Sequence, residues 1–484
     1  MLEIIFNGKN VGREAVKVLG LAENYKMKRE DVKTFLNEDE FGLIKEVLKR
    51  NDFSGKNGDF LEVEGRCSKI LLMGLGKEVS ALSLRENGKK LAKELFRNTE
   101  AVVYVSKVKG CKLTESEIAH SLAFGLELGC YSFDKYFTRK KAEEYSSLEK
   151  VSFVSEKVIE LGDFADYAAL ANAVRYAKDL GNEPSNYLTP EAFAADLKRL
   201  EYLGLEVDVL DKKAMEDEEF KLALAVAKGS VNPPYTVVLK WIGNKEKDNF
   251  DVALVGKGIT YDSGGVTLKT DAQQLNMKFD MCGAAAVAGA MKAIALQKQP
   301  VNAVAVLCLV ENMPNGNAYK PDDVFASMSG QTVEIVDTDG EGRLVLADSL
   351  CFVQKKFDAE RIIDMATLTG TVGAVLAGQF AGLFCDDEKM CRELIETGKS
   401  CGEKLWRLPM TEEFDRWINS RIADMKNVGK RAGDGSQAAC FLKRFVKEGT
   451  KWAHIDIADC ELDADFMATG FGVCLLNAYM RGLK

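Results

Sequence analysis

Short apolar runs alternate with segments of helical periodicity through most of the 484-residue chain, and this alternation limits the fold more than any other feature. Residues 250–258, FDVALVGKG, and residues 301–310, VNAVAVLCLV, read as buried strands with a helical pattern between them. Such an order requires crossover connections, which place successive strands parallel. We therefore predict an α/β fold with a mostly parallel central sheet. Further strands are expected in residues 205–211, 235–243, 332–337 and 361–368.

The same alternation divides the chain into two domains. Residues 69–76 and 101–106 read as strands and residues 116–129 as a helix, which predicts a small N-terminal α/β domain over residues 1–160. An apolar-periodic helix over residues 163–181 ends at a glycine and precedes a turn-rich segment. We place the boundary before this linker helix and assign residues 161–484 to a larger α/β domain.

Composition excludes several classes of protein. The net charge of -9 and the pI near 5.3 disfavour nucleic acid or an anionic membrane as the main partner. The first residues carry charges inside their apolar stretch, unlike a signal peptide, and the longest run of small apolar residues, 284–296, is too short to span a bilayer. Twelve cysteines without a C-x-x-C pair indicate buried thiols in a reducing compartment. We expect a cytoplasmic protein.

Residues 336–348, VDTDGEGRLVLAD, crowd like charges. In an extended chain Asp337, Asp339, Glu341 and Arg343 would share one face, where carboxylates repel one another unless a cation lies among them. A solvated acidic loop is one alternative. An EF-hand loop is another, but its glycine follows three alternating ligands, whereas Gly340 follows two. A β-branched run before the cluster and a helical pattern after it place the acids at the carboxyl end of a strand of the α/β sheet.

A second charged cluster, residues 256–283, follows the apolar run DVALV. It contains Lys257, Asp262, Lys269, Lys278 and Asp280 on glycine-rich backbone, without the spacings of a phosphate-binding loop. Because the chain has only two histidines, a metal centre must be built mostly from carboxylates. The two clusters together supply enough carboxylates for two divalent cations roughly 3.5–4 Å apart.

These motifs resemble those of the M17 leucyl aminopeptidases, a family of cytosolic two-metal peptidases. The similarity rests on VGKGITYDSGG, MKFDMCGAA and DTDGEGRL, and it continues in order through NEPSNYLTP, ENMP, DMATLTG, WAHIDIA and ATGFGV. It spans most of residues 182–473. The N-terminal part carries no motif that would identify it alone.

The resemblance implies a ligand set for two divalent cations. Asp262 and Glu341 would bridge the two cations. Lys257, as a neutral amine, and Asp280 would complete one site, and Asp339 would complete the other. Zinc or manganese is the expected metal, with cobalt and magnesium as further candidates.

The resemblance also implies how a peptide would be cleaved. A water activated between the cations would attack the first peptide bond while one cation holds the free amine. Lys269 would stabilise the oxyanion, and Arg343 would hold a bicarbonate acting as general base. Met277, Leu368 and Gly370 match family positions that line the pocket for the substrate side chain.

The family further implies a macrodomain-like N-terminal domain with an oligomerising or regulatory role, and a homo-hexamer acting on peptides or dipeptides with a free N-terminus, leucine foremost. The chain departs from the family pattern at Asp337, usually asparagine, and at Gly340, usually alanine. Residues 433–439, GDGSQAA, replace a start that is more usually Gly-Gly-Ala, and residues 459–465 also differ. These departures leave the side-chain preference open.

Two other functions fit parts of the sequence. A carboxylate-bridged pair of metals also serves phosphoester hydrolysis. Some bacterial relatives add DNA binding to peptidase activity, although the acidic balance disfavours this as the main role here.

Overall fold

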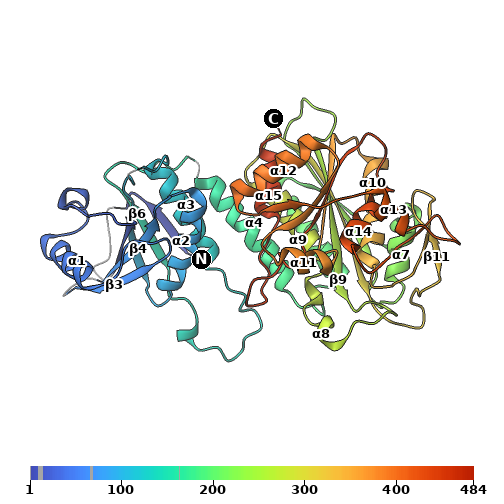
Figure 1. Ribbon diagram of the computed structural model, residues 1–484, viewed down its shortest axis with the longest axis horizontal. Helices are drawn as coiled ribbons and strands as arrows, with labels where there is room; N and C mark the ends of the chain where they lie inside the picture. The colour runs from blue at the N-terminus through green and yellow to red at the C-terminus, as the bar shows by residue number, and fades with distance from the viewer. Residues whose placement is uncertain (1, 9–14, 66–68, 109, 163, 484) are drawn as a thin grey trace. The chain divides into compact units, whose positions relative to one another are not determined.

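The computed structural model describes residues 2–8, 15–65, 69–108, 110–162 and 164–483. The chain forms two compact units, Met1–Ala171 and Asn172–Lys484, and each is an α/β unit (Figure 1). The division falls inside helix α4 (Phe164–Asn182), the helix that the sequence predicts over 163–181. Its predicted first residue, 163, lies outside the described residues.

The first unit is built on a six-stranded sheet that is parallel except for the pair β3 and β4. In sheet order its strands are β1 (Glu3–Phe6), β6 (Lys150–Val154), β5 (Glu100–Tyr104), β2 (Val16–Ala22), β4 (Lys69–Gly76) and β3 (Phe60–Glu64). Period-two alternation buries both faces. Val16 and Val18 of β2 pack toward α2 (Ala81–Glu94) and α3 (Glu115–Gly129), whereas Leu19 and Leu21 pack toward α1 (Glu38–Arg50).

The second unit contains an eight-stranded central sheet. In sheet order its strands are β15 (Leu405–Arg407), β14 (Ala381–Cys385), β17 (Lys451–Asp456), β13 (Arg361–Ala366), β9 (Val252–Asp262), β10 (Asn302–Asn312), β8 (Tyr235–Ile242) and β7 (Glu206–Leu210). The inner strands β17, β13, β9 and β10 are mutually parallel, and antiparallel strands join at both sides. The mostly parallel sheet predicted from the alternation is confirmed.

Helices cover both faces of this sheet (Figure 1). On one face lie α5 (Pro190–Lys198), α9 (Cys282–Leu296), α12 (Glu388–Cys401) and α15 (Val473–Arg481). On the other lie α7 (Lys221–Ala227), α10 (Glu341–Lys356) and α14 (Asp434–Lys443). The remaining short helices of this unit are α6 (Lys212–Asp217), α8 (Asp271–Gln274), α11 (Gly370–Leu376) and α13 (Glu412–Trp417). Among the described helices, none is long and apolar enough to cross a membrane.

One predicted strand lies outside the central sheet. All six predicted runs of this unit form strands, but residues 332–337 contribute only β12 (Thr332–Glu334). It pairs antiparallel with β11 (Val324–Ala326) and parallel with β16 (Met425–Lys426) in a separate three-stranded sheet. The expectation that the acidic cluster follows a strand of the main sheet is therefore wrong. Periodicity identifies a strand but not the sheet that accepts it.

Candidate metal centre

Three carboxylates from distant parts of the second unit meet at the carboxyl end of β9. Asp262 is the last residue of β9, Asp280 follows the short 3-10 helix Met277–Phe279, and Glu341 is the first residue of α10. One oxygen of each lies within 4.8 Å of the others, and all three residues are buried. The structure therefore brings together residues from two clusters that lie about 80 residues apart in the sequence.

Glycines set the position of Asp262. Gly264 and Gly265 adopt φ angles of +84° and +67°, which side chains rarely tolerate. A Cβ on Gly264 would lie 2.5 Å from the carbonyl oxygen of Thr267. The chain can thus turn sharply after β9, and the Gly264 amide donates to Asp262 Oδ1 at 2.9 Å. Asn312 at the end of the neighbouring strand β10 donates to the same oxygen at 2.7 Å.

The segment that carries Glu341 is a turn and a helix, not an extended chain. Strand β12 ends at Glu334, and Glu341 and Arg343 already belong to α10. The predicted sharing of one extended face by four charged side chains is therefore wrong. Asp337 Oδ1 instead accepts from the Asp339 amide at 2.9 Å and stabilises the turn. Glu341 gains from its position at the positive end of a helix.

Lys257 lies at the centre of the carboxylates. Its Nζ is 2.7 Å from Asp280 Oδ1 and 2.9 Å from Glu341 Oε1, and it donates to the Thr367 carbonyl at 2.8 Å. Burial by itself lowers the pKa of Lys257, but the surrounding carboxylates, Asp280 foremost, outweigh burial and raise it. Ligation by a neutral Nζ therefore requires the charge of a nearby dication to overcome these carboxylates.

Lys269 bridges the two acidic clusters by contacting Asp262 of one and Asp339 of the other. Its Nζ is 2.6 Å from Asp262 Oδ2 and also contacts Asp339 Oδ1. Burial opposes its charge, yet Asp262 and the other carboxylates raise the pKa of Lys269 above its usual range. Burial, with Asp262 and Glu341 adding to it, raises the pKa of Asp339 to about 7. Lys269 is thus held as a cation beside the site.

The donor set fits divalent cations. Asp280 Oδ2 and Glu341 Oε2 are buried and have no hydrogen-bond partner among the described residues. A buried carboxylate oxygen without a partner is costly unless a cation binds it. Burial raises the pKa of Asp280 and of Glu341, so their charged forms need more positive charge than the lysines supply. These open oxygens point to one or more divalent cations.

Arg343 does not join the cluster through a described contact. Its guanidinium donates to the Asn427 carbonyl and to Asp434 Oδ1, both at 2.8 Å, and its buried Nε has no partner among the described residues. Asp434 begins α14 and belongs to the segment 433–439 that departs from the family pattern. One arm of the predicted anion-binding guanidinium is therefore shared with a carboxylate of the same chain.

The three residues expected to contact the substrate side chain adjoin the cluster along the chain. Met277 is half-buried and stands three residues before Asp280. Leu368 is half-buried and Gly370 is exposed, directly after the Thr367 carbonyl that binds Lys257. The buried carboxylate of Asp456 fixes this loop by accepting from the amide of Leu368 at 3.0 Å and from that of Thr369 at 3.1 Å.

Sequence reasoning missed the residues that orient the cluster. Asn312 holds Asp262 and also donates to the Thr338 carbonyl at 3.0 Å. Thr367 binds both Lys257 and Asp280. The signal for Asn312 was present, since it ends the apolar strand beside β9 and pairs in register with Asp262. Thr367 accepts from Lys257 through its backbone carbonyl, which sequence does not distinguish, and donates to Asp280 Oδ1 through its hydroxyl at 2.9 Å.

A gap at Gly342 admits the Lys257 side chain to the cluster. A Cβ at this position would lie 2.6 Å from Lys257 Cε and 2.7 Å from Nζ. Gly340, where the family usually has alanine, is also enclosed, because its Cβ would lie 2.7 Å from Val428 Cγ2. This departure therefore matches the local packing.

Buried carboxylates with open oxygens at the carboxyl edge of an α/β sheet are typical of the metal centres of hydrolases. Residues 175–477 match the catalytic domain of the cytosol aminopeptidase family, and residues 18–140 match its N-terminal domain. The chain belongs to this family. It is thus a metal-dependent aminopeptidase, as the motifs predicted.

Relatives and solved structures agree over nearly the whole length. A probable cytosol aminopeptidase of Sinorhizobium fredii is 40% identical over 91% of both chains, and one of Rhizobium etli is 41% identical over 92% of this chain and 91% of its own. The bottromycin maturation enzyme BotP in complex with Mn is 30% identical, with a TM-score of 0.85 over 97% of this chain and 99% of its own. A tomato leucine aminopeptidase mutant is 28% identical, with a TM-score of 0.88 over 100% and 97%.

Replacing Gly342 by alanine is expected to displace the Lys257 amine without unfolding the protein. The new methyl group meets the flexible end of a lysine, so the side chain yields and helix α10 keeps its stability. The metal content of purified protein, measured by mass spectrometry, should fall about tenfold, while the melting temperature stays within a few degrees. Gly316→Ala, with no atom within 4 Å of the new Cβ, is the matched control. Normal metal content in Gly342→Ala would contradict the placement of Lys257.

Proposed function

We propose that this aminopeptidase removes leucine and similar N-terminal residues from peptides and dipeptides with two divalent cations. The observation that carries the proposal is the pair of open oxygens, Asp280 Oδ2 and Glu341 Oε2, within a buried cluster of carboxylates. Asp262 and Glu341 are proposed to serve both cations. Lys257 and Asp280 complete one site, and Asp339 completes the other.

The proposed ligands are oxygen donors with one amine. Such a set suits manganese, zinc, cobalt or magnesium to differing degrees, so the chain does not itself select one metal. Manganese is favoured first because the similar structure of BotP is a complex with Mn. When bound, the cations would activate a water molecule and attract the free amine and the carbonyl oxygen of the substrate.

The chain's own side chains would then complete the chemistry. Lys269, held as an ammonium by Asp262 and Asp339, is proposed to donate to the oxyanion that develops on the carbonyl oxygen. Met277, Leu368 and Gly370 are proposed to bound the pocket for the substrate side chain. The half-buried apolar surface of Met277 and Leu368 supports a preference for apolar residues.

A homo-hexamer in the cytoplasm completes the proposal. The family resemblance supports both, and the match to the family's N-terminal domain over residues 18–140 is consistent with a role for that domain in assembly or regulation. Light scattering of the purified protein would give the mass directly, and a monomer would rule out the hexamer.

Cleavage should require a free N-terminus, because the proposed site takes the substrate's amine. Leucyl-p-nitroanilide is expected to be hydrolysed, and its N-acetylated form should react at the background rate. The measurement is the release of p-nitroaniline by purified, manganese-loaded protein. p-Nitrophenyl phosphate serves as the control for phosphoester hydrolysis. Comparable rates on the free and acetylated amides would refute aminopeptidase action.

Replacing either lysine by methionine, which is similar in side-chain length but has no amine, is expected to impair the enzyme in two different ways. Lys257→Met should lose metal, and added manganese should restore part of its activity. Lys269→Met should keep its metal and lose kcat by about 10²–10³-fold, the usual cost of an oxyanion donor. Metal content and kcat at saturating manganese are measured on both. The roles are reversed if Lys269→Met loses metal and Lys257→Met retains it.

Asp434 is proposed to limit the use of bicarbonate. A bicarbonate held by Arg343 would have to share the guanidinium with the Asp434 carboxylate, which already accepts from it at 2.8 Å. Asp434→Gly frees this arm and restores the more usual family residue. The ratio of kcat with added bicarbonate to kcat without it should therefore be at least about threefold larger in this variant than in the wild type. Asp415→Gly, which removes a carboxylate bound to Arg444, is the control. An equal response of wild type and Asp434→Gly would exclude this role.

A further inference from the structure

A cavity of about 230 Å³ lies at the carboxyl ends of three adjacent strands in the first unit. Its wall is formed by the ends of β2 and β5 and by the segments that follow β2, β5 and β6. The volume equals about seven or eight water molecules at ~30 Å³ each, which suits a small molecule. The residues proposed for peptide cleavage all belong to the second unit.

The cavity coincides with the point where the connections of this sheet change direction. The chain leaves β2 through α1 on one face, whereas it leaves β5 through α3 on the opposite face. Strands β2 and β5 are parallel neighbours. In open α/β sheets a crevice opens outside the carboxyl ends of two such strands, and ligands bind there. The topology therefore makes this cavity a candidate binding site.

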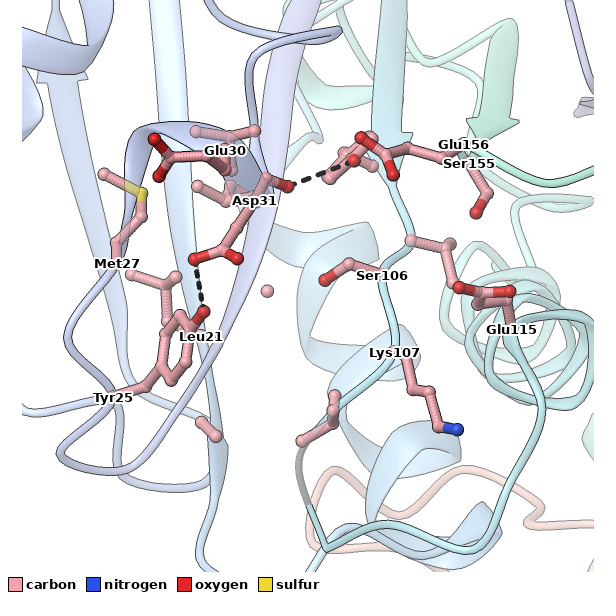
Figure 2. Close-up of a pocket in the computed structure, with 17 residues that line it drawn as sticks. Leu21, Tyr25, Met27, Glu30, Asp31, Ser106, Lys107, Glu115, Ser155 and Glu156 are labelled. Atoms are coloured by element: carbon pink, nitrogen blue, oxygen red, sulfur yellow. Dashed lines mark hydrogen bonds between the residues drawn. The ribbon is translucent and has the colours of Figure 1, made fainter.

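The lining of the cavity is acidic. The charged side chains that line it are the carboxylates of Glu30, Asp31, Glu115 and Glu156 and the ammonium of Lys107. Outside the lining, Lys157 Nζ lies 3.9 Å from Glu115 Oε2 and is 74% exposed, so the carboxylates remain in excess. Figure 2 shows Asp31 on one side of the crevice and Glu115 and Glu156 on the other, while the side chain of Lys107 extends away from Asp31. Such a field repels phosphate and other anions and attracts cations.

Two tyrosines also line the crevice and lie close to its carboxylates. Tyr25 donates to Asp31 Oδ2 at 2.5 Å, and Tyr104 donates to the Asp31 carbonyl at 3.1 Å. Burial raises the pKa of Tyr104, and the carboxylates of Glu156, Glu115 and Asp31 raise it further. Aromatic rings beside carboxylates are typical of sites that bind organic ammonium groups.

We propose that this crevice binds a small alkyl ammonium compound, such as a short diamine or a basic amino acid. Its ammonium group faces the carboxylates of Glu115 and Glu156, and its carbon chain lies against Tyr25 and Met27. Net positive charge distinguishes these ligands from a neutral amino acid such as leucine. The crevice shares no residue with the cluster of Asp262, Asp280 and Glu341.

The test is isothermal titration calorimetry of the full-length, manganese-loaded protein with 1,5-diaminopentane, and separately with lysine, leucine and AMP. The variant Glu115→Gln/Glu156→Gln keeps the shape of the crevice and removes two charges. The matched control, Glu64→Gln/Glu94→Gln, removes two exposed carboxylates of the same unit that do not line the crevice. Melting temperatures verify that both variants are folded.

Diaminopentane or lysine is expected to bind the wild type and the control equally, with a Kd that rises with salt. The crevice variant should bind about tenfold more weakly, since neutralising each partly exposed carboxylate costs up to about fivefold. The kcat of this variant on leucyl-p-nitroanilide should equal that of the wild type. The binding of amines is measured by calorimetry, so it can be judged even if the protein proves inactive as a peptidase. Equal affinity in the crevice variant would place the amine elsewhere, including at the metal centre, and overturn the proposal. Binding of AMP or leucine without binding of diaminopentane or lysine would also overturn it.

Discussion

Repulsion among buried carboxylates is the constraint on which the second unit depends. Asp262, Asp280 and Glu341 come from three different parts of the chain, and their carboxylates lie close together in a buried site. Carboxylates this close repel one another unless positive charge lies between them. Two lysines supply part of this positive charge, Lys257 from within the cluster and Lys269 from its edge. The tight turns at Gly264 and Gly265 and the space left by Gly342 exist because these charged groups must approach within hydrogen-bond distance.

The sequence predicted the fold class and pointed to the carboxylates that the structure brings together at the end of β9, because both depend on local signals. The strand at 250–258 is apolar and ends near Asp262, so period and position sufficed. What failed depended on partners that are distant in sequence. The run at 332–337 is a strand by composition, but its pairing with β16 is set by residues near 425. The alternation of Asp337, Asp339 and Glu341 suggested an extended chain, yet the helix begins at Glu341, because side-chain spacing of two does not exclude a turn.

Two of the departures from the family pattern, Asp337 and Asp434, add a carboxylate near the metal centre. Asp434 meets the guanidinium of Arg343, and Asp337 serves the turn before α10 through a backbone amide. In the first unit a different set of carboxylates surrounds a crevice at the ends of β2, β5 and β6. Both units thus place acidic groups at the carboxyl edges of their sheets, but only the second encloses buried carboxylate oxygens that lack partners among the described residues of the site.

Three consecutive residues in the first turn of α10 meet three different neighbours. Glu341 faces the carboxylate cluster, Gly342 leaves room for Lys257, and Arg343 reaches Asp434. Consecutive helical residues point about 100° apart, so each direction is tied to the others. Inserting or deleting one residue in the segment 335–340 would rotate all three together and send each side chain to the wrong neighbour. The length of this short connection is therefore as strictly determined as the identity of the side chains it delivers.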